Sequence, residues 1–239
     1  MSNLLTRTRP VRRALALAMV LGSPLLAQTP SAKPSVAILY FTNAALVDAA
    51  AYAPLSKGLA EMLITELGQN TAIDVVERDR LQAVIEEQNL QKTDRVDQAT
   101  AIKLGKTLGA RHLLMGSFVI DPARNMRIDV RAVNTQTSRI DYVESISGKA
   151  DKLLELVIAL GAKVNSGLKL PAWSGVSSNT PAAKSPNQFK ALMAMSLALE
   201  AEDSHDKPAA DRQYREAIAL APDFSRAKVR LASLETAAR

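Results

Sequence analysis

Residues 96–117, VDQATAIKLGKTLGARHLLMGS, constrain the fold of this chain more than any other segment. Asp97 stands where a helix N-cap is expected, and apolar residues follow at roughly helical spacing: Ala99, Ile102, Leu104 and Leu108. Gly109 supplies a stop for that helix. The run from Leu113 to Gly116 is too apolar to face water on both sides, which is typical of a buried strand. The segment therefore predicts a helix that ends at a glycine and passes directly into the centre of a sheet.

This segment lies within a longer alternation of strand-like and helix-like stretches that covers residues 35–170. Runs rich in β-branched or alternating apolar residues predict strands at 36–41, 73–77, 113–120, 126–133 and 140–146. Apolar residues at helical spacing predict helices at 55–69, 79–90, 96–109 and 151–167. Strands that alternate with helices and end in a hairpin predict an α/β sandwich of two or three layers with a mixed sheet.

Three further pieces of sequence carry a family resemblance together with the segment 96–117. They are the opening strand VAILYF at 36–41, LSKGLAEMLITEL at 55–67 and VVERDRLQAVIEEQNL at 75–90. Their order and spacing resemble the CsgG-like family, which is typified by the curli production assembly/transport component and has flagellar and penicillin-binding-protein-activator relatives. The resemblance covers residues 35–170. It implies a domain that assembles and binds other proteins and has no known chemistry of its own.

The first 27 residues have the pattern of a secretory signal peptide. Residues 1–13 contain four arginines and no acid, and an apolar run follows at 14–21. A charged start, a short apolar middle and a small residue at the end are typical of a cleaved signal, and the apolar run is too short to span a bilayer. We expect cleavage after Ala27, with a site nearer Ala32 as the alternative, and a periplasmic product that is possibly associated with the outer membrane.

The charge balance argues against nucleic acid as a partner. The whole chain carries a net charge of +6. Removal of the four signal arginines leaves +2, and no basic run interleaved with aromatic residues occurs elsewhere. The chain contains no cysteine, which excludes disulfides, a thiol nucleophile and the lipidated cysteine that anchors many CsgG-like proteins. We therefore expect contact with a membrane only through other proteins.

The C-terminal quarter is expected to form a small helical unit. Residues 171–187, with three prolines and several serines, read as a linker, and residues 188–239 are helical in pattern. Six residues fall near the packing positions of a tetratricopeptide-like repeat: Leu197, Ala198, Ala210, Tyr214, Ala217 and Pro222. One repeat with a capping helix buries too little apolar surface to be stable by itself. The unit is therefore expected to pack against the first domain, a second copy or a partner. A plain helical hairpin is the alternative.

The motifs that could indicate phosphate binding, metal binding or acid–base catalysis lack the sequence context that such sites require. Gly105-Lys106-Thr107 resembles the end of a phosphate-binding loop, but it lies inside a predicted helix and lacks the upstream glycine. His112 and His205 have no second metal-ligating neighbour in sequence, and Glu86-Glu87 reads as a solvated pair. Glu77-Arg78 is expected to form an ion pair that fixes the following helix. We therefore predict no enzymatic activity, no catalytic residues, no cofactor and no metal.

These observations favour a non-enzymatic periplasmic adaptor that acts by protein–protein contact in envelope biogenesis or secretion. The expected partners are envelope proteins, with self-association as a further possibility. The first alternative is a subunit of an oligomeric CsgG-like outer-membrane secretion complex. The second is a periplasmic module that binds a small ligand or a glycan.

Overall fold

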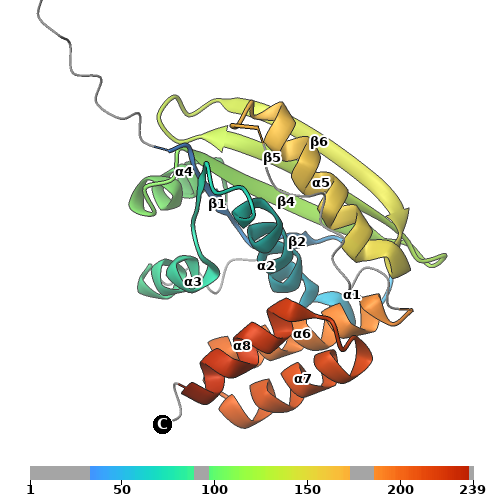
Figure 1. Ribbon diagram of the computed structural model, residues 1–239. Helices are drawn as coiled ribbons and strands as arrows, with labels where there is room; N and C mark the ends of the chain where they lie inside the picture. Colours follow the sequence, from blue (N-terminus) through green and yellow to red (C-terminus); the bar gives the residue numbers. More distant parts are fainter. Residues whose placement is uncertain (1–32, 89–96, 173–185, 237–239) are drawn as a thin grey trace, which may run out of the picture. The chain divides into compact units, whose positions relative to one another are not determined.

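The computed structural model describes residues 33–88, 97–172 and 186–236 (Figure 1). Its centre is a mixed sheet in the order β3-β1-β4-β5-β6, with β2 paired to β4 beside β1. Strands β1, β3 and β4 are parallel, and β4, β5 and β6 form an antiparallel meander. The bounds of the strands are β1 Ser35–Ile38, β2 Thr42–Asn43, β3 Asp74–Val75, β4 His112–Ile120, β5 Asn125–Asn134 and β6 Ile140–Lys149.

Helices cover both faces of this sheet, so the α/β part has three layers. Side chains alternate across β1: Val36 and Ile38 join the core with α2 and α5, and Ala37 joins the core with α3 and α4. Because both faces are covered where β1 and β4 pair, Val36–Ile38 of β1 and Leu113–Met115 of β4 are buried without interruption. The helices of this part are α1 Ala49–Tyr52, α2 Leu55–Gly68, α3 Arg78–Glu87, α4 Gln98–Thr107, the short 3₁₀ helix η2 Ala150–Lys152 and α5 Leu153–Gly167.

The helix–glycine–strand segment folds as its sequence predicts. The Asp97 carboxylate accepts a hydrogen bond from the Thr100 N–H at 2.9 Å and caps α4. Gly109 has a φ of +68°, a left-handed conformation that a glycine adopts without steric cost. The chain then enters β4, whose residues Leu113 and Leu114 are almost fully buried on opposite faces. The predicted mixed α/β sandwich is confirmed.

The opening strand is shorter than predicted. The expected strand 36–41 ends at Ile38, because the Phe41 N–H turns away and donates to the Ser56 carbonyl in α2 at 3.2 Å. The chain then returns to the sheet as β2, where the Ala44 N–H donates to the Phe118 carbonyl at 2.9 Å. The predicted strand 73–77 likewise shortens to β3. The predicted end of the helix 79–90 lies outside the described residues.

Three helices follow at the C-terminal end: α6 Gln188–Asp203, α7 Lys207–Leu220 and α8 Ser225–Thr236. They share one continuous apolar core with α2 and α5. Figure 1 shows the three helices gathered at one end of the α/β part. Where α6 packs on α2, a Cβ built on Gly58 would lie 1.9 Å from the Ser196 Oγ. The three helices therefore pack directly on the α/β part. Among the described residues, no helix is long and apolar enough to cross a membrane.

The predicted signal peptide with its cleavage site at Ala27 lies outside the described residues, and so does most of the predicted linker 171–187. The division into residues 35–170 and 188–239 stays a prediction.

Candidate functional site

The predicted repeat-packing residues occupy two different environments. Four of them are fully buried in the shared core: Ala198, Ala210, Tyr214 and Ala217. Leu197 on α6 is 40% exposed, and Pro222 is exposed in the turn between α7 and α8. The small alanine side chains allow α6 and α7 to approach closely, and the Tyr214 ring is the largest fully buried side chain of this part.

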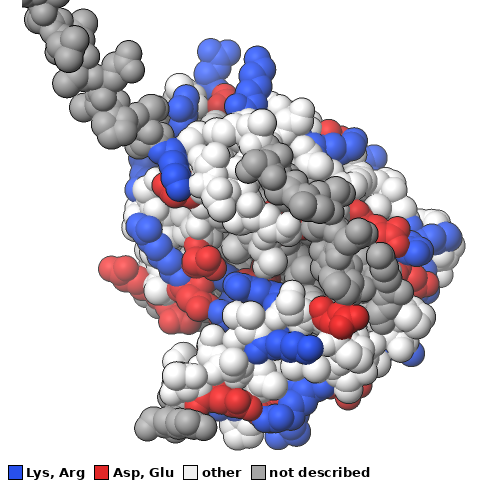
Figure 2. All heavy atoms as spheres, in the orientation of Figure 1, with Lys and Arg blue, Asp and Glu red and all other residues white. Residues whose placement is uncertain are grey.

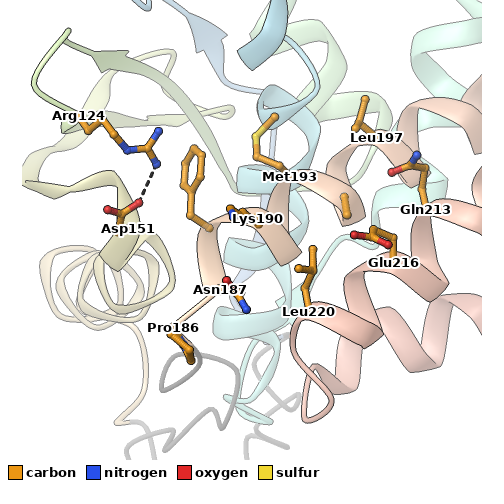
Figure 3. A pocket seen from close by; sticks show the side chains of 12 residues that line it. Arg124, Asp151, Pro186, Asn187, Lys190, Met193, Leu197, Gln213, Glu216 and Leu220 are labelled. Carbon is orange, nitrogen blue, oxygen red and sulfur yellow. Dashed lines mark hydrogen bonds and ion pairs between the residues drawn. The ribbon is translucent and has the colours of Figure 1, made fainter.

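Leu197 lines a groove of about 660 Å³ between α6, α7 and the start of η2 (Figure 3). Its apolar lining comes from Phe189, Met193, Ala194, Leu197 and Leu220, and its charged lining from Arg124, Asp151, Lys190 and Glu216. An apolar floor with a charged rim of both signs is the composition of many protein-binding grooves. Leu197, which is predicted to pack inside the repeat, therefore faces this groove and is not buried.

One end of the groove is fixed by an ion pair and an aromatic contact. The Arg124 Nη2 lies 2.7 Å from the Asp151 Oδ1, and the Arg124 guanidinium lies 4.8 Å from the centre of the Phe189 ring. The Phe189 ring meets the Tyr52 ring edge to face at 6.2 Å. Because Arg124 and Asp151 are well exposed, the ion pair itself contributes only about 0–1 kcal/mol. It fixes the position of the rim more than it stabilises the fold.

A second cluster of polar residues, the buried charge network, joins α6 to the α/β part. Its centre is Arg78 at the start of α3, which is 3% exposed. The Arg78 Nη1 donates to the Asp203 Oδ1 at 2.7 Å, and the Arg78 Nη2 donates to the Glu202 Oε2 at 3.3 Å. On its other side, Asp203 pairs with the Lys57 Nζ at 2.7 Å. Two acidic residues at the end of α6 thus neutralise two cations of α2 and α3.

Helix α8 closes the same network from the other side. The Arg230 Nη1 lies 2.9 Å from both carboxylate oxygens of Asp79, and the Arg230 Nη2 also donates to Glu202. Arg226 donates to Glu61 on α2, whose side chain is fully buried. Helices α2, α3, α6 and α8 each contribute at least one member. The network therefore links the C-terminal helices to the α/β part through charges that are mostly buried, with Asp79 as its exposed member.

The pKa values in the network follow from burial and from the charges that face one another. Burial raises the pKa of Tyr40, whose hydroxyl accepts from Arg78 at 3.3 Å. Burial lowers the pKa of the Arg230 guanidinium, but Asp79 and Glu202 more than compensate and hold it above its usual value. Burial works against ionisation of Asp79 as well, and Arg230 nevertheless keeps the pKa of Asp79 below its usual value. Asp79 and Arg230 are therefore charged at neutral pH, and the Tyr40 hydroxyl keeps its proton.

The structure places the other residues considered in the sequence at structural positions. Arg78 forms the ion pairs that fix α3, with the adjacent Asp79 and with the distant Glu202 and Asp203. The expected partner Glu77 is instead exposed and lies 3.6 Å from Arg226. Gly105-Lys106-Thr107 lies inside α4. His112 is the first residue of β4, and its Nε2 lies 3.3 Å from the Asp141 Oδ2 of β6. His205 is exposed in the turn between α6 and α7.

Sequence reasoning missed the buried charge network. Arg226 and Arg230 are four residues apart on α8 and share a face with the buried Ala227, and this spacing is the one local signal for it. Across the face shown in Figure 2, lysine and arginine side chains are mixed with aspartate and glutamate. Charged residues of this kind are ordinarily read as solvated, which is why the buried members do not stand out.

The comparisons with known proteins support the resemblance seen in the sequence. The family described as curli production assembly/transport component CsgG matches residues 21–120. This confirms the predicted CsgG-like resemblance, over a range that ends with β4. A comparison with curated proteins finds no match.

Several solved structures resemble the chain at low identity. The LpoB C-terminal domain from Salmonella enterica is 14% identical, with a TM-score of 0.37, and the match covers 49% of this chain and 84% of that domain. Lipoprotein GNA1162 from Neisseria meningitidis is 15% identical (TM-score 0.39; 55% and 94% covered). The PelC dodecamer from Paraburkholderia phytofirmans is 14% identical (TM-score 0.36; 59% and 90% covered). At these TM-scores the three structures do not define what this chain does.

Proposed function

We propose that this chain is a non-enzymatic, secreted periplasmic adaptor that acts by protein–protein contact in envelope biogenesis or secretion. Support comes from the CsgG family match and from the signal-like sequence that ends at Ala27. In this proposal residues 1–27 are removed, residues 35–170 form the CsgG-like domain, residues 171–187 are the linker and residues 188–239 form a tetratricopeptide-like unit. Envelope proteins are the partners, and the membrane is reached only through them.

The groove between α6 and α7 is the surface through which we propose that the adaptor binds. It places the exposed Leu197 beside Met193 and Leu220, within a rim of mixed charge. A short apolar anchor inserted into such a groove removes water from both partners, and a few such contacts supply most of the binding free energy of an interface. The exposed Leu197 in this groove is the observation that carries the proposal.

The test compares two substitutions on the C-terminal helices. Leu197→Glu places a charge in the groove, and Val229→Glu places the same charge on α8, where Val229 is 52% exposed and does not line the groove. The tagged full chain is crosslinked in cells, and the envelope proteins recovered with each variant are compared with those recovered with the wild type.

We expect Leu197→Glu to lose a specific envelope component at least about tenfold and Val229→Glu to retain it, since loss of one central anchor costs about 2 kcal/mol or more. Equal recovery with both variants would contradict binding through the groove. Recovery of only copies of this chain would favour the oligomeric secretion complex instead. Retention of residues 1–27 in the mature protein would contradict the periplasmic location.

A further inference from the structure

Strand β6 has one outer edge that the described part of the sheet does not pair. It lies last in the strand order, with β5 on one side, and α5 crosses the face beside it (Figure 1). The Ala150 N–H donates to the Arg124 carbonyl at 2.9 Å, so residue 150 points its backbone toward β5. Backbone direction alternates along a strand. Val143, Ser145 and Ser147 therefore direct their N–H and C=O groups outward, where a further strand would pair.

A glutamate side chain occupies this outer edge. The Ser145 N–H, which points outward, donates to the Glu144 Oε1 at 3.0 Å. The same oxygen accepts from the Lys163 Nζ of α5 at 3.1 Å, and the Glu144 Oε2 accepts from the Tyr142 hydroxyl at 2.6 Å. The hydrogen bonds from Tyr142, Lys163 and Ser145 hold the pKa of Glu144 below its usual value. The carboxylate thus takes the place that the carbonyl of a pairing strand would take.

Packing against α5 holds this carboxylate in position. A Cβ built on Gly167 would lie 2.1 Å from the Tyr142 Cε2, so the Tyr142 ring lies directly against the backbone of α5. Burial, together with the hydrogen bond to Glu144, raises the pKa of Tyr142 to about 12. The tyrosine hydroxyl is therefore a proton donor over the whole physiological range. A series of contacts therefore runs from α5 to the strand edge: the Tyr142 ring packs on Gly167, its hydroxyl donates to Glu144, and Glu144 accepts from the Ser145 N–H.

The strand is self-complementary in a two-fold antiparallel register. When two β6 strands pair about Ser145, Val143 lies opposite Ser147 of the second copy, and Tyr142 lies opposite Gly148. Lys149 lies opposite the bulge residue Asp141 of the other strand. Within each copy these two side chains stay with β5, where Lys149 donates to Asn125 and Asp141 accepts from Asn134. Long outer strands are templates for pairing with another chain unless a charge or a cover blocks them. A second copy of this chain fits the edge that Glu144 covers.

We propose that the Glu144 carboxylate closes the outer edge of β6 against pairing with the β6 strand of a second copy of this chain. The inference is independent of the groove between α6 and α7. A partner or a modification that moves Glu144 from the edge would convert a monomer into a dimer, which makes the contact a switch for self-association.

The experiment measures the dimer dissociation constant of the full chain by size exclusion with light scattering, across a range of protein concentrations. Glu144→Ala removes the cover. Glu155→Ala is the matched control, because Glu155 is an exposed acid on α5 whose ion-pair partner is Lys152 of η2 and not a residue of β6. We expect Glu144→Ala to lower the dissociation constant at least about tenfold, as one outward hydrogen-bonding group becomes available. Glu155→Ala is expected to match the wild type.

A second substitution identifies the surface that pairs. Ser147→Pro removes an outward N–H and leaves the pairing with β5 intact, so the variant Glu144→Ala/Ser147→Pro should return to the monomer. A Glu144→Ala protein that stays monomeric would overturn the proposal, and so would a dimer that persists with Ser147→Pro. If Glu144→Ala does not fold, Lys163→Ala loosens the same carboxylate from α5. An unchanged dissociation constant for Lys163→Ala would then overturn it.

Discussion

The Arg78 guanidinium and the Asp203 carboxylate meet 2.7 Å apart between the first turn of α3 and the last turn of α6. The two residues are separated by 125 positions in the sequence, and both side chains are almost completely buried. A buried ion pair stabilises little by itself, because the loss of hydration offsets most of the attraction. Its removal from one side is costly, since the remaining buried charge loses a close partner of opposite sign. The pair therefore ties the C-terminal helices to one position on the α/β part.

Asp203→Asn is expected to lower the free energy of unfolding by about 3 kcal/mol, because Arg78 and Lys57 then face one another without the intervening negative charge. Urea denaturation followed by circular dichroism measures the change. The matched control is Asp211→Asn on α7, whose partner Arg215 lies on the surface. A control that costs as much as Asp203→Asn would contradict the special role of the buried network.

The coupling between the two residues is tested by adding Arg78→Met to Asp203→Asn. We expect the double variant to be more stable than the sum of the two single effects predicts, by about 1–3 kcal/mol, because residues in direct contact do not contribute independently. Additive losses would show that the two side chains act on separate parts of the fold.

Gly58→Ala is expected to destabilise the protein by about 1–3 kcal/mol, because the added methyl group would lie 1.9 Å from the Ser196 Oγ and push α6 away from α2. Gly68→Ala in the same helix has no atom within 4 Å of the new Cβ. It is expected to be neutral or to stabilise by up to about 1 kcal/mol. Thermal unfolding of both variants shows whether the loss of stability comes from the close packing of α2 on α6 or from placing alanine anywhere in α2. Equal effects would contradict the contact between α2 and α6.

His112 is expected to make stability depend on pH below about 6.5. Burial lowers the pKa of His112, and the hydrogen bond to Asp141 offsets only part of that effect. The unfolded chain therefore binds a proton at a higher pH than the folded chain does. The contribution of neutral His112 to the free energy of unfolding is fully present above the unfolded pKa of about 6.5. It is lost as the pH falls toward the lower pKa that His112 has in the folded chain.

The measurement is the free energy of unfolding at several pH values for His112→Gln and for His205→Gln, which changes the exposed histidine. We expect His112→Gln to flatten the pH dependence below pH 6.5 and His205→Gln to retain it. If the free energy of unfolding of His112→Gln changes with pH as it does in the wild type, the pH dependence comes from other groups.

Local rules account for the parts of the fold that the sequence predicts well. The cap at Asp97 and the left-handed Gly109 fix the ends of α4 through contacts a few residues long. The alternation of Met126, Arg127 and Ile128 predicts which face of β5 is buried, and the structure agrees. Short-range patterns are reliable here because the residues that decide them are neighbours in the chain.

The site depends on contacts that no local pattern contains. Glu61 and Arg226 are 165 residues apart, and each alone looks like an ordinary solvated charge. Leu197 and Ala198 are adjacent on α6, yet one lines the groove and the other is fully buried. The difference follows from which face of α6 has a neighbouring helix, and that is set by the packing of α6 on α2 and α7.

We propose above that this chain binds an envelope protein through the groove between α6 and α7. The most direct measurement places a photo-reactive amino acid at position 197 in the tagged full chain, with position 229 on α8 as the control, and identifies what is crosslinked in living cells. We expect one defined envelope partner to be crosslinked from position 197 and not from position 229. The same products from both positions, or no product from position 197, would contradict it.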